Sequence, residues 1–187
     1  MSVPPPLSEI RELPEATWKG FVLDFKYSTS EYYDIDRRTD TPFSIRLVRK
    51  PFENTQIKHF EGHLYSDYLD DPTAFVLYEN GEIVGFLEIE REKWHNRLRI
   101  TELLILPGYR NMGYGKLLME KAKSISKTEG FREIVLETQT CNTMAIDFYF
   151  SQGFQVNGID LSSYTNEDIQ AKEVRLELAY QDEFGKN

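Results

Sequence analysis

The spacing of apolar residues predicts a strand meander in the middle of the chain. Three strand-like runs lie at residues 74–79, 83–90 and 98–106. The first two are separated by Asn80-Gly81, a dipeptide typical of two-residue hairpin turns, and the last two by Trp94-His95-Asn96. Short connections of this kind join antiparallel neighbours, so the meander is predicted to be antiparallel.

The N-terminal third gives two strands and one helix. Apolar and polar residues alternate over 18–27 and 43–49, which predicts two strands. The polar stretch 28–41 between them is predicted to form no packed element. Residues 57–69 are predicted to be a helix that ends before Asp71-Pro72, because their apolar positions follow helical spacing. Those positions are Ile57, Phe60, Leu64, Tyr65 and Tyr68.

The C-terminal half alternates between helices and strands. A helix begins after Gly113 and ends at Gly130, and a second is capped by Asn142 and closed by Gly153. Strands are predicted at 134–137, 155–161 and 174–178. A strand reached through a helical crossover usually runs parallel to the one before it, so the fold class is α+β with a mixed, mostly antiparallel sheet.

The run Arg110-Asn111-Met112-Gly113-Tyr114-Gly115-Lys116 forms a strand–loop–helix junction. A helix N-terminus offers unpaired N–H groups and a positive dipole, so a diphosphate can bind there if the backbone comes close. Gly113 and Gly115 lack the Cβ atoms that would prevent this approach. Neither a G-x-x-x-x-G-K-[ST] nor a G-x-G-x-x-G motif is present, which favours coenzyme A over nucleoside triphosphates and dinucleotides.

Composition narrows the classes of partner. The chain has 187 residues, 40% of them hydrophobic, which suits one domain, and a net charge of −9. This charge disfavours nucleic acid and anionic membranes and favours a small cationic partner. A single cysteine, no Cys/His cluster with metal-ligand spacing and no long apolar span predict a soluble cytoplasmic protein without a metal.

The run LLILPGYRNMGYGKLL, followed by N-x-x-A-x-x-F-Y-x-x-x-G-F, resembles the GCN5-related N-acetyltransferases (GNAT). The resemblance implies a sheet of about seven strands, with acetyl-CoA in a cleft where two strands splay apart. Asn111 stands where the family often has glycine, and asparagine tolerates the left-handed backbone conformation better than other residues that carry a Cβ.

Within this family, the run IVLETQTCNTMAIDFYFSQGFQVNGID, followed by Tyr164 and Asn166, is similar to streptothricin acetyltransferases. These enzymes acetylate an amine of the antibiotic's β-lysine moiety, which would confer resistance to it. The likeness extends from about residue 18 to residue 180. We therefore expect an N-terminal extension at 1–17, an acetyltransferase domain at 18–180 and a C-terminal tail at 181–187.

Acetyl transfer to an amine needs a neutral nucleophile, a polarised thioester carbonyl and a proton for the departing thiolate. Tyr149 lies two helical turns after Asn142 on the same helix face and is the general-acid candidate, because a phenol stays protonated at neutral pH. Glu102 is the candidate base, and Glu88 and Glu137 are its rivals. The resemblance also allows Thr101 to occupy the position of the acid. In a further alternative, the carboxylate only holds the charge of the cationic substrate and water takes the proton.

The remaining candidate site residues divide into two groups. The predicted acetyl-CoA contacts are Leu104, Ile105, Leu106, Arg110, Asn111, Met112, Gly113, Tyr114, Gly115, Lys116 and Asn142. Within this group, freed N–H groups of the strand 104–106 are expected to face the thioester oxygen. The predicted acceptor contacts are Glu88, Glu137, Asp160 and Tyr164.

Alternatives remain at the acceptor. A polyamine, an aminoglycoside or a protein N-terminus is a different acceptor for the same enzyme class, and a non-catalytic acetyl-CoA sensor is a different class. A homodimer is compatible with the sequence.

Overall fold

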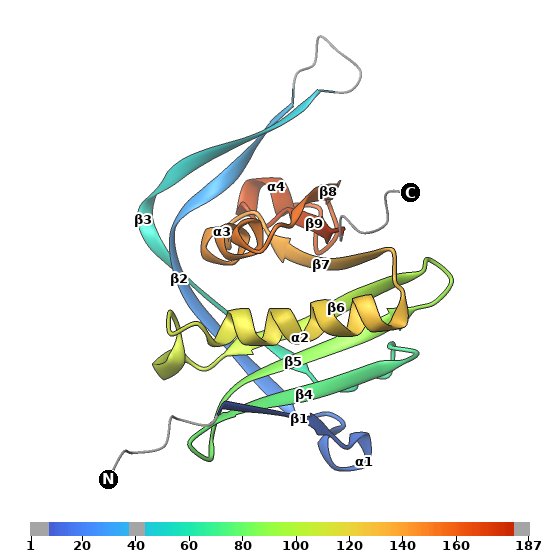
Figure 1. The fold of residues 1–187 in the computed structure, drawn as a ribbon. Coiled ribbons are helices and arrows are strands. Elements are labelled where there is room, and N and C mark those ends of the chain that lie inside the picture. The colour runs from blue at the N-terminus through green and yellow to red at the C-terminus, as the bar shows by residue number, and fades with distance from the viewer. Residues whose placement is uncertain (1–7, 38–43, 182–187) are drawn as a thin grey trace. The chain divides into compact units, whose positions relative to one another are not determined.

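The computed structural model describes residues 8–37 and 44–181 of the chain, and Figure 1 shows its elements. The described residues form two compact units. The first comprises residues 8–25, 61–135 and 181, and the second comprises residues 26–37, 44–60 and 136–180. A seven-stranded sheet has the strand order β1-β4-β5-β6-β7-β9-β8, and β2 and β3 form a separate two-stranded ribbon.

The predicted meander is confirmed in the first unit. It consists of β4 (Pro72–Glu79), β5 (Glu82–Glu92) and β6 (Arg97–Ile105), each antiparallel to the next. At the first turn both Asn80 and Gly81 have positive φ angles, of 51° and 86°, as a primed hairpin turn requires. The sheet therefore follows the local sequence signals in this region.

Helix α2 (Tyr114–Glu129) crosses one face of these strands (Figure 1). It buries Leu118, Met119 and Ala122 and ends at Gly130 with a left-handed φ of 75°, as predicted. Gly85 of β5 allows the close packing, because a Cβ there would lie 2.7 Å from the Leu104 carbonyl oxygen and 3.4 Å from Leu118 Cδ1. The opposite face carries the hydrophobic core of this unit: Leu13, Leu23, Leu64, Tyr65, Ala74, Val76, Phe86 and Leu104.

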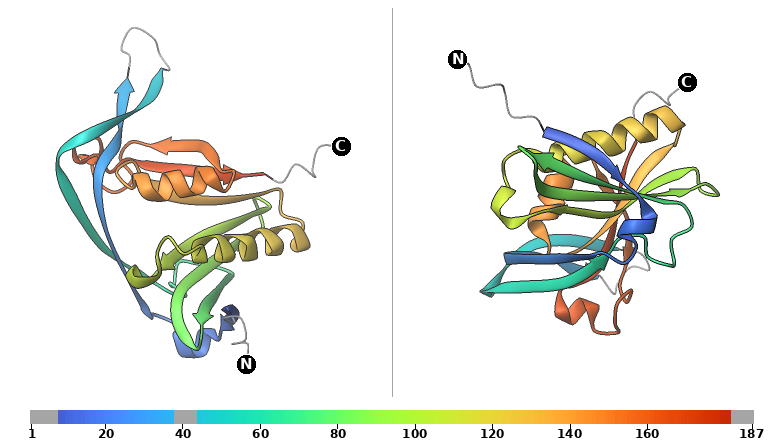
Figure 2. Two further views of the ribbon diagram at one scale, coloured as in Figure 1. Left: turned by 60° about the vertical axis from the view of Figure 1, so that its left-hand side comes forward. Right: turned by 90° about the horizontal axis from the view of Figure 1, so that it is seen from below.

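The expectation of an unstructured polar stretch at 28–41 is wrong as far as residue 37. Strand β2 (Val22–Arg37) continues through it and lies beside β3 (Ile45–His63), as Figures 1 and 2 show. Backbone hydrogen bonds between two strands do not require apolar side chains, so a polar stretch can form a strand when a partner is present. Residues 38–41 lie outside the described part of the chain.

The predicted helix at 57–69 is also wrong. Its first half belongs to β3, and Ile57 and Phe60 are 70% and 45% exposed, whereas Leu64 beyond the strand is fully buried. The apolar residues therefore do not share one face, and their helical spacing is coincidental. A pairing partner remote in sequence outweighs the local periodicity.

The boundaries of the other N-terminal elements also differ from the prediction. Strand β1 (Ser8–Leu13) forms the edge of the main sheet and pairs antiparallel with β4, and a short helix α1 (Glu15–Trp18) follows it. Trp18 thus lies in a helix rather than at the start of a strand. The start of the strand predicted at 43–49 falls on a residue outside the described ranges.

The second unit confirms the predicted C-terminal elements. After β7 (Glu133–Gln139), which begins in the first unit, come α3 (Thr143–Ser151), β8 (Gln155–Asp160) and β9 (Arg175–Tyr180). Strands β8 and β9 are antiparallel. A one-turn helix α4 (Asp168–Ala171) was not predicted.

Two features are absent from the residues that the structure describes. No helix there is long and apolar enough to cross a membrane. No group of three His, Cys, Asp or Glu side chains there is arranged to hold a metal ion.

Candidate active site

The junction between β6 and α2 has the backbone conformation that the sequence predicts. After the 3-10 turn Pro107–Tyr109, Asn111 adopts a left-handed φ of 63°, and Gly113 has a φ of 90° at the N-cap of α2. The expectation that asparagine accepts the left-handed conformation in this loop is confirmed. A residue with a branched Cβ would be strained at either position.

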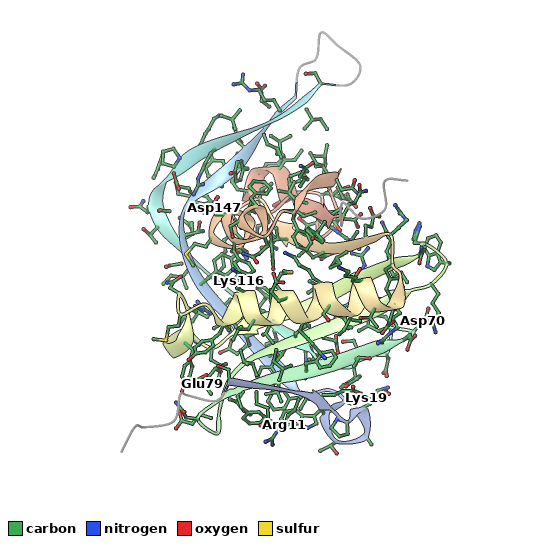
Figure 3. The ribbon with its side chains drawn as sticks, in the orientation of Figure 1. Arg11, Lys19, Asp70, Glu79, Lys116 and Asp147 are labelled. Atoms are coloured by element: carbon green, nitrogen blue, oxygen red, sulfur yellow. The ribbon has the colours of Figure 1, made fainter. Side chains whose placement is uncertain are left out.

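The N-terminus of α2 is open to an anion. No side chain caps it, and the space beside Gly113 holds no described protein atom within 4 Å of where a Cβ would be. Lys116 projects from the first turn, as Figure 3 shows, and is exposed. Unpaired amides, an adjacent cation and room for close approach fit the diphosphate of a coenzyme A.

Arg110 connects this loop to the end of β6. Its Nε donates to the carbonyl oxygen of Ile105 at 3.1 Å, and the side chain is half-buried. The hydrogen bond fixes the guanidinium beside the loop. Arg110 therefore combines a structural contact with a positive charge near the predicted diphosphate position.

At least one N–H group of the segment 104–106 is used within the sheet. The Leu106 N–H donates to the Val84 carbonyl oxygen at 3.0 Å, so it is used within the sheet. Backbone groups alternate in direction along a strand, and those of Ile105 therefore point away from β5. The expectation of freed N–H groups is therefore wrong for Leu106.

A β-bulge in β6 separates the two candidates for the acidic position. Glu88 of β5 is opposite Glu102, and Ile89 is opposite Ile100, so Thr101 is the extra residue. The Thr101 hydroxyl donates to Glu88 Oε2 at 2.7 Å. Glu102 instead lies against Gly62 of β3, where a Cβ would be 2.5 Å from its Oε1.

Glu88 is buried, with 1% of its surface exposed. Its Oε1 accepts the Tyr65 N–H at 2.5 Å, and its Oε2 accepts the Thr101 hydroxyl. Burial raises the pKa of Glu88, although these two hydrogen bonds oppose the rise. A carboxylate held in this way is poorly placed for the direct contact with a cationic acceptor that the sequence suggested.

Asn142 and Tyr149 lie on α3 in the second unit. The Asn142 side chain accepts the Ala145 N–H at 3.4 Å, so it caps the helix as predicted. Tyr149 is buried at 9% exposure, and its ring packs against Phe154 with the ring centroids 6.0 Å apart. Their seven-residue separation places both on one helix face.

Cys141, the residue before this cap, is fully buried and in contact with the Tyr27 hydroxyl, with 3.5 Å between sulfur and oxygen. Burial raises the pKa of its thiol, although the Tyr27 contact opposes the rise. A thiol in this environment is a poor nucleophile.

The three remaining acceptor candidates lie in the second unit: Glu137 on β7, Asp160 at the end of β8 and Tyr164 in the loop that follows β8. Glu137 pairs with Arg175, with 2.5 Å between Oε2 and Nη2, and accepts the Tyr164 hydroxyl at 3.5 Å. Asp160 is opposite Arg175 in the β8–β9 ladder. Burial, and next the charge of Glu137, raise the pKa of Tyr164.

Asp168 fixes the loop that carries Tyr164. It is 1% exposed and accepts hydrogen bonds from the Tyr164 N–H, the Thr165 N–H and the Thr165 hydroxyl. Burial acts to raise the pKa of Asp168, but the hydrogen bonds outweigh it and lower the pKa. The aromatic ring of Tyr164 is therefore presented from an ordered loop.

The sequence was then compared with known protein families. A model of the Acetyltransferase (GNAT) family matches residues 30–154, more than half of the chain. The chain belongs to the GNAT acetyltransferase family. Acetyl-CoA is the donor in this family, in agreement with the open α2 N-terminus.

Two streptothricin acetyltransferases are similar to this chain over half of its length or more. Streptothricin acetyltransferase of Streptomyces lavendulae is 30% identical over 150 residues, which cover 76% of this chain and 78% of the relative. Streptothricin acetyltransferase A of Bacillus subtilis strain 168 is 31% identical over 93 residues, which cover 50% and 53%.

Two solved structures have the same fold. The crystal structure of nourseothricin acetyltransferase gives a TM-score of 0.74 at 24% identity, covering 93% of this chain and 98% of that one. A putative streptothricin acetyltransferase from Bacillus anthracis str. Ames, solved in complex with acetyl coenzyme A, gives 0.72 at 22% identity, covering 95% and 98%.

Sequence reasoning missed several residues around the predicted acetyltransferase site. Gly62 and Tyr65 were assigned to a helix that does not form, and nothing in the sequence placed them near Glu102 or Glu88. Asp168 and Arg175 belong to no motif recognised in the sequence. Gly62, Tyr65 and Arg175 act through contacts with segments remote in sequence, whereas Asp168 accepts local hydrogen bonds from Tyr164 and Thr165 that no sequence pattern indicated.

The raised pKa of Glu88 predicts a pH-dependent stability difference between the wild type and Glu88→Gln. The folded acetyltransferase binds this proton more tightly than the unfolded chain, so ionisation of Glu88 destabilises the fold as pH rises from its ordinary pKa of 4.5 through the raised value. The free energy of unfolding of the wild type, relative to the variant, should therefore fall over that range. The expected fall is about 1.4 kcal/mol per unit of pKa difference.

Urea unfolding at a series of pH values from acid to neutral measures this difference. Glu92→Gln is the control of opposite sign, because Glu92 pairs with Arg99 and Arg97 at 2.5 and 2.8 Å. Burial acts to raise the pKa of Glu92, but these partners outweigh it and lower the pKa. A pH-independent difference between the wild type and Glu88→Gln would contradict the prediction.

Proposed function

We propose that this enzyme transfers the acetyl group of acetyl-CoA to an amine of a small cationic acceptor, and that streptothricin is the acceptor. The observation that carries the proposal is the 30% identity with the S. lavendulae streptothricin acetyltransferase over 76% of the chain. The net charge of −9 agrees with a cationic substrate. Acetylation of the β-lysine moiety would remove one ammonium charge and so inactivate the antibiotic.

The loop residues hold the donor. The amides at the start of α2, with Arg110 and Lys116 beside them, would bind the diphosphate, and the N–H of Ile105 would bind the pantetheine arm. Bound acetyl-CoA supplies an activated acetyl thioester and a thiolate leaving group. The protein residues then have to move two protons.

Tyr149 holds the proton that the leaving sulfur needs. A phenol with a reference pKa of about 10 is protonated at neutral pH and can donate to a thiolate whose conjugate acid has a pKa of about 8.5. Glu102 takes the proton from the attacking amine, directly or through water. The same carboxylate would also attract the ammonium form of the acceptor.

Mass spectrometry of a reaction containing the enzyme, acetyl-CoA and streptothricin tests this proposal. A mass gain of one acetyl group on the β-lysine moiety is the expected result. A panel of polyamines, aminoglycosides and peptides with a free N-terminus tests the other acceptors in parallel. Binding of acetyl-CoA without turnover of any amine would favour the non-catalytic sensor instead.

Glu137→Gln should raise KM for streptothricin by about 2- to 5-fold and leave KM for acetyl-CoA unchanged. The substitution removes a negative charge beside Tyr164, and one exposed charge contributes about 0.5–1 kcal/mol to binding a cation. Steady-state kinetics with each substrate varied in turn measure the effect. Glu167→Gln, an exposed acid on the same loop, is the matched control for net charge. Equal KM values in the two variants would exclude Glu137 from the acceptor site.

A further inference from the structure

The buried carboxylate of Glu88 accepts a hydrogen bond from the bulge in β6. Thr101 has no partner residue in the β5 register, and its hydroxyl donates instead to Glu88 Oε2 at 2.7 Å. Glu102, the proposed base, is the next residue in the chain. The direction in which its side chain leaves the strand therefore depends on how the bulge is held.

The second oxygen of Glu88 holds a different segment. Oε1 accepts the N–H of Tyr65, which has a left-handed φ of 56° in the turn after β3. The Tyr65 hydroxyl is itself fixed, because it donates to the Leu13 carbonyl oxygen and accepts the Ala74 N–H at 3.0 Å. Glu88 thus ties the bulge to a turn whose own position is set by β1 and β4.

Both of these segments adjoin Glu102. The bulge residue Thr101 precedes it, and Gly62, three residues before Tyr65, lies against it so closely that a Cβ would be 2.5 Å from Oε1 and 2.7 Å from Oε2. Glu88 contacts one segment through each oxygen. A shift of either segment would change the position of the Glu102 carboxylate.

We propose that Glu88 is a positioning residue for Glu102, acting through the Thr101 hydroxyl and the Tyr65 N–H. This inference rests on the proposed function, in which Glu102 takes the proton from the amine. Glu88 itself is unsuited to that task, since it is 1% exposed and both of its oxygens already accept hydrogen bonds. Burying a carboxylate lowers the stability of the fold. In return, Glu88 can accept hydrogen bonds from two segments of the chain at once.

A double-mutant cycle of Thr101→Val and Glu102→Gln tests the inference. Thr101→Val removes the hydroxyl at nearly constant volume and should lower kcat by about 5- to 30-fold, with KM for acetyl-CoA unchanged, because a displaced base loses part of a general-base effect. In the Glu102→Gln background the same substitution should change kcat by less than about twofold, because the group it positions is gone. Thr101→Ser keeps the hydroxyl and should restore most of the wild-type kcat.

Thr73→Val is the matched control. Its hydroxyl accepts Arg91 Nη1 at 2.7 Å on β4 of the same sheet, so the variant loses a comparable hydrogen bond without touching Glu102 or Glu88. Its kcat should equal that of the wild type. Circular dichroism establishes that each variant is folded at the assay temperature.

The outcomes separate the two proposals. Independent, multiplicative losses in the double mutant, or failure of Thr101→Ser to restore kcat, would overturn the positioning role of Glu88 alone. A wild-type kcat for Glu102→Gln would overturn the base and the positioning role together. Crystal structures of the wild type and Thr101→Val need no turnover: the carboxylate should move away from Gly62, and an unchanged contact would overturn the inference.

Discussion

Gly113→Val should weaken acetyl-CoA binding by about 100-fold or more, which follows if two charge-assisted hydrogen bonds of about 1.5–3 kcal/mol each are lost. Gly113 has a φ of 90° and open space beside it. A branched side chain would fill that space and push the backbone out of the left-handed region, so the first amides of α2 would turn away from the diphosphate. Isothermal titration calorimetry with acetyl-CoA or coenzyme A measures the change in Kd.

Gly81→Val is the control that separates binding from backbone strain. Gly81 has a similar φ of 86° and likewise has no described atom within 4 Å of where a Cβ would be, but it lies in the β4–β5 turn. Both variants should lose stability to a comparable extent. Only Gly113→Val should lose the cofactor, and a near-normal Kd in that variant would contradict the proposed diphosphate site.

Tyr149→Phe should lower kcat by about 10- to 100-fold, within the usual range for removal of a general acid, and leave acetyl-CoA affinity intact. The phenol supplies the proton to the leaving sulfur, and phenylalanine keeps the packing against Phe154 while removing only the hydroxyl. Pre-steady-state and steady-state kinetics at saturating substrate measure the loss.

Tyr180→Phe provides the matched comparison for Tyr149→Phe. The Tyr180 ring also packs against Phe154, with the centroids 5.6 Å apart, so the two variants lose the same group beside the same aromatic residue. A kcat for Tyr149→Phe equal to that of Tyr180→Phe would remove Tyr149 from the mechanism.

The parts of the fold that the sequence predicts correctly are those with local signals. Asn80-Gly81 forms the two-residue turn of a hairpin, and Gly113 and Gly130 are the N-cap and the C-cap of α2. The predicted strands 18–27 and 43–49 overlap β2 and β3, but the extension of both strands was missed because their polar residues pair with each other and carry no local strand pattern. Strand β1 was missed because it is ordered by pairing with β4, a segment remote in sequence.

The same distinction applies to the candidate site. The diphosphate loop is one contiguous run, so its residues and even the left-handed backbone of Asn111 could be predicted. The surroundings of Glu102 could not, because a bulge changes which side chains share a face and leaves no mark in the sequence. The contacts of Glu88 with Thr101 and Tyr65 depend on that bulge.

The burial of Cys141 has a practical consequence for spectroscopy. It is the only thiol in the chain, and it is fully enclosed with a raised pKa. Maleimide dyes and nitroxide spin labels react with exposed thiolates, so the native protein provides a silent background. A single cysteine introduced on the surface would therefore carry the only probe, and fluorescence or electron paramagnetic resonance could follow one chosen position during turnover.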